Sequence, residues 1–227
     1  MVSVLDSPPI RDAATVIVVL DPGGVASILM GQRGAKAAFM PNKFVFPGGA
    51  VDAGDAAVPL AAPLDPRCAR RLTEASDGPT PGAIASAAIR ELWEETGQIL
   101  GTPGIWDAPP DWAGFAATGH RPAADALRFV FRAITPPGRP RRFDARFLLA
   151  DAAALQGDPD DFSQASDELS HLQWVPLAEA RGLDLPFITE IVLAEVARML
   201  PDLGAPSVVP FFQNDDEDSL LRALGRA

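Results

Sequence analysis

The chain has 227 residues, of which 48% are hydrophobic, so it is long and apolar enough to bury a substantial core. Its 30 acidic residues outnumber its 19 lysines and arginines, and the net charge of -11 argues against a nucleic-acid-binding surface, which needs Lys and Arg to neutralise phosphates. One cysteine rules out an intramolecular disulfide, and two histidines make a zinc site of the usual kind unexpected.

The start of the chain has none of the features of a secretory leader. Asp6, Pro8 and Pro9 precede any long apolar run, so we do not expect a signal peptide. Nor does any stretch approach the roughly 18 apolar residues that a membrane-spanning helix needs. We therefore expect a cytoplasmic protein that does not bind membranes.

The first half of the chain alternates between strand and turn signals. The β-branched run 13–21 (AATVIVVLD) predicts a buried strand, and a Pro-Gly-Gly turn joins it to a second strand at 25–33. Residues 43–49 (KFVFPGG) predict a short strand ended by proline. Residues 56–83 are rich in Ala and Pro, which predicts a surface excursion with a short helix near 66–75.

The second half predicts helices and strands in alternation. Residues 83–97 (AIASAAIRELWEETG) have the strongest helical pattern and end in a glycine, which favours helix termination. Further strands are expected at 127–135, 141–150, 169–177 and 207–212, and a second long helix at 186–200. The pattern predicts one mixed α+β domain over 1–227, with a β-rich centre.

Three glutamates fall on one face of the helix predicted at 83–97. At about 100° per residue, Glu94 and Glu95 lie about 60° and 40° to either side of Glu91, opposite an apolar arc. Like charges at these spacings repel, and Arg90 alone cannot neutralise three acids. A hard divalent cation such as Mg²⁺ would do so, although a solvated polar face is the simpler explanation of such a pattern.

The residues in and before this helix resemble the Nudix box. Arg90, Glu91, Leu92, Glu94, Glu95 and Gly97 match its second half (Arg-Glu-apolar-x-Glu-Glu-x-Gly), and Gly49 stands as its first glycine. There are three departures. Asp55 replaces the first box glutamate, 34 residues (56–89) separate it from Arg90 where the standard box is much shorter, and Gln98 replaces the last apolar residue.

The first two departures recur in one branch of the Nudix hydrolases, the coenzyme A diphosphatases with a long insertion inside the box. Residues 33–55 (RGAKAAFMPNKFVFPGGAVDAGD) look like the pattern of that branch, and 141–150 and 168–180 look like its later strands. The resemblance covers most of residues 13–212. It implies a Nudix fold, in which helices flank a mixed central β-sheet in an α/β/α sandwich.

The resemblance also implies a metal site. Glu91, Glu94 and Glu95, with the Gly48 carbonyl, would hold Mg²⁺ or Mn²⁺ against a diphosphate, where a glycine leaves room for that carbonyl to face the metal. The alternative for the Gly48-Gly49 pair is an ordinary turn. Arg90 is expected to orient a helix carboxylate.

The remaining roles are more open. The general base is either Glu91 or Glu168, and a solvated loop acid is the simpler interpretation of Glu168. Arg33 could bind a phosphate through its guanidinium, or be an ordinary surface arginine. Phe46 could contact substrate, although core packing is favoured over base stacking. Asp55 could cap or brace the box.

The implied activity is metal-dependent hydrolysis of a nucleoside diphosphate linked to another moiety. Coenzyme A or acyl-coenzyme A is the favoured substrate, and ADP-ribose or NADH is the alternative. A non-catalytic nucleotide-binding regulator is the competing class, but such regulators usually lose the box acids that this chain keeps. We expect a small-molecule partner and no nucleic acid. A homodimer stays open, because residues 56–83 are expected to shape the substrate mouth or a subunit contact.

Overall fold

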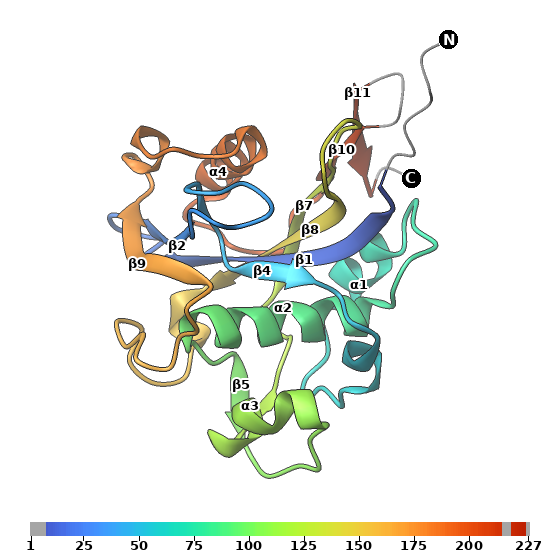
Figure 1. Ribbon diagram of the computed structural model, residues 1–227. Helices are drawn as coiled ribbons and strands as arrows, with labels where there is room; N and C mark the ends of the chain where they lie inside the picture. The colour runs from blue at the N-terminus through green and yellow to red at the C-terminus, as the bar shows by residue number, and fades with distance from the viewer. Residues whose placement is uncertain (1–7, 215–218, 226–227) are drawn as a thin grey trace.

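The computed structural model describes residues 8–214 and 219–225, so Asp6 lies outside the described part. A central mixed sheet has helices on both faces, which confirms the α/β/α sandwich expected of a Nudix fold (Figure 1). Along the sheet the strands run β11 (Ser219–Leu224), β10 (Val209–Asn214), β7 (Arg128–Ile134), β8 (Arg142–Asp151), β1 (Ile10–Leu20), β2 (Ser27–Arg33) and β3 (Phe44–Val45). Two further strands pair off this path, β4 (Gly48–Ala50) with β1 and β9 (Leu169–Pro176) with β2.

Strand β1 is the centre of the sheet because its β-branched run is buried on both faces. It runs parallel to β8 from Ile10 to Val19. On its other side it pairs with β4 over Ala13 to Thr15 and with β2 at Val19 and Leu20. A strand covered by helices on both sides needs continuous apolar residues. This explains why the sequence there does not alternate between apolar and polar positions.

Helices α2 (Pro81–Thr96) and α4 (Phe187–Met199) cover opposite faces of the sheet (Figure 1). Helix α2 begins where the Thr80 hydroxyl accepts a hydrogen bond from the Ala83 amide at 3.2 Å, a standard N-cap. It ends at Gly97, whose φ of +76° is the left-handed conformation that glycine adopts most easily. The predicted bounds of both helices are therefore correct to within one or two residues.

The prediction that residues 56–83 form a surface excursion is wrong. Helix α1 (Pro66–Leu72) and the chain before it place four apolar side chains in the core on the α2 side of the sheet: Val58, Leu64, Cys68 and Leu72. The high content of Ala and Pro in this segment hid these positions. The segment lies on the face of the sheet away from α4, beside α2 (Figure 1).

A small unit between α2 and β7 was not predicted. Strands β5 (Gly101–Pro103) and β6 (His120–Pro122) form a two-stranded sheet, and helix α3 (Ala113–Ala117) lies between them in sequence. Trp112 and Phe115 anchor this unit, and the Phe115 ring lies edge-on to that of Trp93 on α2, with centroids 6.1 Å apart. The elements are too short for their periodicity to be visible in the sequence. Within the described ranges, no helix has the length and apolar character to cross a bilayer.

Candidate active site

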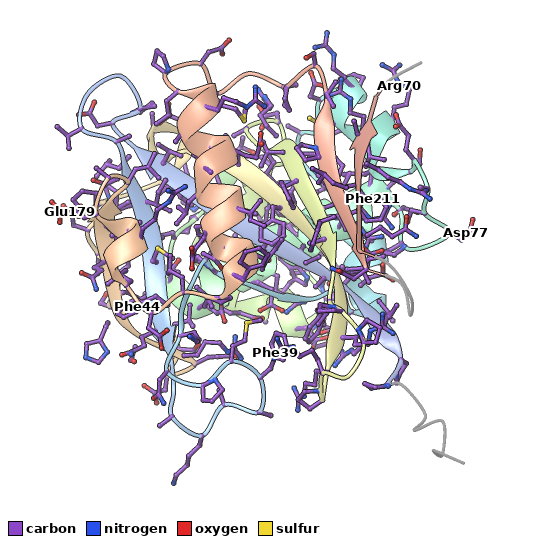
Figure 2. All side chains as sticks on the ribbon, turned by 90° about the horizontal axis from the view of Figure 1, so that it is seen from above. Phe39, Phe44, Arg70, Asp77, Glu179 and Phe211 are labelled. Carbon is purple, nitrogen blue, oxygen red and sulfur yellow. The ribbon has the colours of Figure 1, made fainter. Side chains whose placement is uncertain are left out.

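A cleft of about 410 Å³ opens on the α4 side of the sheet. Its floor is formed by β1 and β4, and its walls by the β2–β3 loop (residues 34–43), the β7–β8 hairpin (residues 135–141) and the start of α4. Figure 2 looks down on this side, where Phe39 extends from the β2–β3 loop towards the β7–β8 hairpin. Its ring meets that of Phe143 edge-on, with centroids 5.3 Å apart.

The glycine pair at 48–49 brings the sheet and the acidic face of α2 together. A Cβ atom at Gly49 would overlap the carboxyl group of Glu91, which also lines the cleft. A Cβ at Gly48 would lie 2.5 Å from the Ala14 carbonyl oxygen and 2.6 Å from the Thr15 Cα, and its φ is +156°. Gly48 is therefore required by close packing on β1, and Gly49 leaves room for the Glu91 carboxyl group of α2.

Glu95 is the most deeply buried acid of the box. Its side chain is about 1% exposed, and its Oε2 accepts a hydrogen bond from the Gly48 amide at 2.7 Å. Its Oε1 is buried and has no hydrogen-bond partner among the residues that the structure describes. Burial raises the pKa of this carboxyl to about 8, against the smaller effect of the Gly48 amide, which lowers it.

Glu91 is similarly perturbed. Burial raises its pKa to about 7, with the Arg90 guanidinium opposing the rise and the charges of Glu94 and Glu168 adding to it. The pKa of Glu94 is also raised, again mainly by burial. Acids whose pKa values are shifted by burial and by one another are typical of functional sites.

Arg90 holds the acids in place, as predicted. Its Nε and Nη2 bind the two carboxylate oxygens of Asp55, each at 3.1 Å, and Nη2 also donates to the Ala50 carbonyl at 3.0 Å. Its Nη1 contacts Glu91 at 2.9 Å and Glu94 at 3.2 Å. Asp55, which replaces the first box glutamate, is buried and braces the box from the other side of the insertion.

The three box glutamates do not yet surround a common point. Within residues 8–214 and 219–225, no three His, Cys, Asp or Glu side chains form a ready cation site. Glu91 and Glu94 both accept hydrogen bonds from Arg90 Nη1, whereas Glu95 accepts one from the Gly48 amide. The role of all three as metal ligands stays a prediction.

The two other predicted polar residues meet at the cleft. Arg33 Nη2 lies 3.4 Å from Glu168 Oε1, and its Nε donates to the Phe39 carbonyl at 3.1 Å. The Glu168 side chain is 56% exposed, as expected for a loop acid, and its charge raises the pKa values of Glu91 and Glu95. Both residues line the cleft, so they are placed to meet a ligand.

Phe46 is both a core residue and a wall of the cleft. Its side chain is buried and packs edge-on against Phe147, with ring centroids 6.4 Å apart. Core packing is therefore confirmed. A contact with a bound ligand stays a prediction, because the ring also lines the cleft.

Several cleft residues were missed by the sequence reasoning. They are Arg11, Thr15, Phe39, Arg139, Arg141 and Phe143. A weak signal was available, since the hairpin sequence PPGRPRR is unusually basic for this acidic chain. Its position beside the box depends on the pairing of β1 with β8, which no local pattern reveals.

Known proteins with similar sequences are Nudix hydrolases. No protein-family model matches the chain. Nudix hydrolase 7 of Caenorhabditis elegans is 30% identical over 179 residues, which cover 73% of this chain and 51% of that protein. The acyl-coenzyme A diphosphatase NUDT19 of Gallus gallus is 27% identical over 238 residues, which cover 75% of this chain and 62% of that protein. The chain thus spans only about half to three fifths of these relatives.

Solved structures agree with this assignment. A NUDIX hydrolase from Alicyclobacillus acidocaldarius is 28% identical with a TM-score of 0.62, covering 84% of this chain and 92% of that one. A MutT protein from Bacillus halodurans has a TM-score of 0.50 at 16% identity, covering 94% and 97% of the two chains, which shows the fold alone. With its α/β/α sandwich and its split box of Gly49, Arg90 and three glutamates, the chain belongs to the Nudix hydrolase family.

Proposed function

We propose that the protein is a metal-dependent diphosphatase that cleaves the diphosphate linkage of a nucleoside diphosphate joined to another moiety. Coenzyme A or acyl-coenzyme A is the favoured substrate. The observation that carries the proposal is the pairing of the half-buried Glu91 with the buried Glu95 beside the cleft. One oxygen of this pair, Glu95 Oε1, has no partner within the described part of the chain.

These residues fit a divalent cation. A buried carboxylate oxygen without a partner is costly, and the raised pKa values of both acids show that negative charge is unfavourable there. Glu91, Glu94, Glu95 and the Gly48 carbonyl would hold Mg²⁺ or Mn²⁺, and both Glu91 and Glu94 would turn from the Arg90 Nη1 that they share towards the ion. Such an ion, when bound, neutralises phosphate charge and lowers the pKa of water.

The chain's own residues would position the substrate and move the proton. Arg33 at the cleft can hold diphosphate oxygens, because a guanidinium binds phosphate through two parallel hydrogen bonds. Glu91 and Glu168 both line the cleft, and either could accept the proton of the attacking water. Cys68 is fully buried in α1, where burial raises its pKa, so it is a poor nucleophile.

The apolar lining of the cleft supports a substrate with an apolar arm. Beyond the acids, its walls are aromatic and aliphatic, with Phe39, Phe143, Phe187 and Ile188 among them. Phe187 is 69% exposed at the start of α4, where an apolar arm could cover it. Such walls suit the pantetheine or acyl part of coenzyme A derivatives. The similarity to an acyl-coenzyme A diphosphatase supports the same substrate, and ADP-ribose and NADH remain the alternatives.

A substrate panel tests the proposal. Coenzyme A, an acyl-coenzyme A, ADP-ribose and NADH would be incubated with Mg²⁺ or Mn²⁺ in ¹⁸O-water, and the products identified by mass. We expect adenosine 3′,5′-bisphosphate and a phosphopantetheine product from coenzyme A, with the label on a phosphate. Label only in a released acyl acid, or no turnover of any diphosphate, would refute the proposal.

A further inference from the structure

A second group of charged residues lines the cleft away from the Nudix box. Arg11 at the start of β1 and Arg139 and Arg141 on the β7–β8 hairpin all border the cleft and are exposed; we call them the arginine rim. The chain has 30 acidic and only 19 Lys and Arg residues. Three arginines on one edge of one cleft are therefore a local reversal of the overall charge.

The arginine rim is largely unpaired. Arg139 and Arg141 have no hydrogen bond or ion pair with any residue in the described ranges. Arg11 Nη2 lies 3.9 Å from Asp52 Oδ1, with side chains 58% and 62% exposed, and such exposed pairs contribute little. Their charges are thus available to a ligand.

Strand pairing sets the distance between this rim and the box. Thr15 pairs with Gly48 of the box, and Arg11 lies four residues before Thr15 on β1. Four residues correspond to about 13 Å of strand at about 3.3 Å per residue. Ile10 pairs with Arg142 at the base of the hairpin, so Arg139 and Arg141 rise beside Arg11. The arginine side chains reach back across part of this separation. The distance that remains between the box and the rim is comparable with the span of a nucleoside.

We infer that the arginine rim binds a phosphomonoester that the substrate carries in addition to its diphosphate. The inference rests on the proposed function, because it assumes that the diphosphate lies at the box. A guanidinium binds phosphate oxygens bidentately, so a cluster of three recognises this doubly charged group better than a hydroxyl. The substrate class is a nucleotide diphosphate phosphorylated on the ribose, at the 3′ or the 2′ position.

Matched substrates test this directly. Coenzyme A differs from 3′-dephospho-coenzyme A, and NADPH from NADH, only in the ribose phosphate. We expect the wild-type enzyme to favour one phosphorylated member by about tenfold or more in kcat/KM, mainly through KM. Preference within the first pair identifies a 3′-phosphate, and preference within the second pair a 2′-phosphate.

Charge-matched variants separate a specific site from general attraction. The double variant Arg139→Gln and Arg141→Gln should lose the preference while hydrolysing the dephosphorylated member as before. The control, Arg70→Gln with Arg181→Gln, removes the same charge from exposed positions that do not line the cleft, and it should keep the preference. Figure 2 labels Arg70 on α1.

Failure of this inference can be told from failure of the proposed function. Equal kcat/KM within both pairs, or a preference that survives in the Arg139 and Arg141 variant, overturns the inference while hydrolysis continues. If no diphosphate is hydrolysed, calorimetry with adenosine 3′,5′-bisphosphate, adenosine 2′,5′-bisphosphate and AMP decides. Tighter binding of either bisphosphate that the double variant loses supports the rim, and equal binding of all three overturns it.

Discussion

Replacing Glu95 with glutamine should change how the stability of the metal-free protein depends on pH. The pKa of Glu95 rises from 4.5 to about 8 on folding because its carboxyl group is buried. The folded state therefore holds this proton more tightly than the unfolded state. The resulting stability is fully present below about pH 4.5 and is lost as the pH rises towards 8. At about 1.4 kcal/mol per pKa unit, Glu95 alone accounts for a loss of up to about 4–5 kcal/mol.

The variant isolates this charge from the change in packing. Glutamine cannot ionise, so its own costs, including a buried amide without a partner, are the same at every pH. Glu91, with its pKa raised to about 7, still titrates in the variant and leaves a smaller loss. The free energy of unfolding of the wild type should therefore fall more steeply between pH 5 and 9 than that of the variant.

Urea unfolding in EDTA at several pH values measures both slopes. Glu190→Gln, at an exposed position on α4, is the control and should follow the wild-type profile. Added Mg²⁺ should restore the stability of the wild type at high pH, because a bound cation stabilises the ionised acids. Parallel profiles for the wild type and the Glu95 variant would refute the assignment of the buried charge.

Three further predictions concern the helix, the glycines and the insertion. Glu94→Gln should lower turnover by several orders of magnitude at saturating Mg²⁺, while circular dichroism shows an intact fold. Glu168→Gln should cause a comparable loss of turnover only if Glu168 is the base. Steady-state kinetics measures both, and near-normal turnover of the Glu94 variant would contradict the role of Glu94. Gly49→Ala should impair activity because its methyl group overlaps the Glu91 carboxyl, and Gly23→Ala, with no described atom within 4 Å of the new methyl group, is the matched control that should keep full activity. Leu72→Ala should destabilise the protein by about 2–5 kcal/mol in urea unfolding with little change in KM, and a change below about 0.5 kcal/mol would restore the view that the insertion is peripheral.

The features that the sequence could predict are those determined by short spacings. The common face of Glu91, Glu94 and Glu95 follows from the helical repeat, and the end of α2 follows from Gly97. The motif also linked Asp55 to Arg90 across 34 residues, which periodicity alone could not do. Glu168 was singled out only by the family resemblance, as the loop acid that could serve as the base in place of Glu91.

The features that the sequence could not predict depend on contacts between segments far apart in the chain. The core role of the insertion rests on Cys68 and Leu72, four residues apart on a helix of only seven residues whose flanks are rich in Pro and Ala. The arginine rim exists because β1 and β8 run parallel in one register. The sharing of Arg90 Nη1 by Glu91 and Glu94 is a choice of side-chain conformation that spacing does not determine.

The ion pair between Asp55 and Arg90 has a consequence for how this chain can vary. It closes residues 56–89 into a loop whose ends are held together at the helix, independently of the path between them. The entropy of closing a loop rises only slowly with its length. Residues added beside the exposed Asp77 would therefore leave the acids and the cleft where they are. Length variants of this segment should differ in melting temperature, and should share one substrate profile.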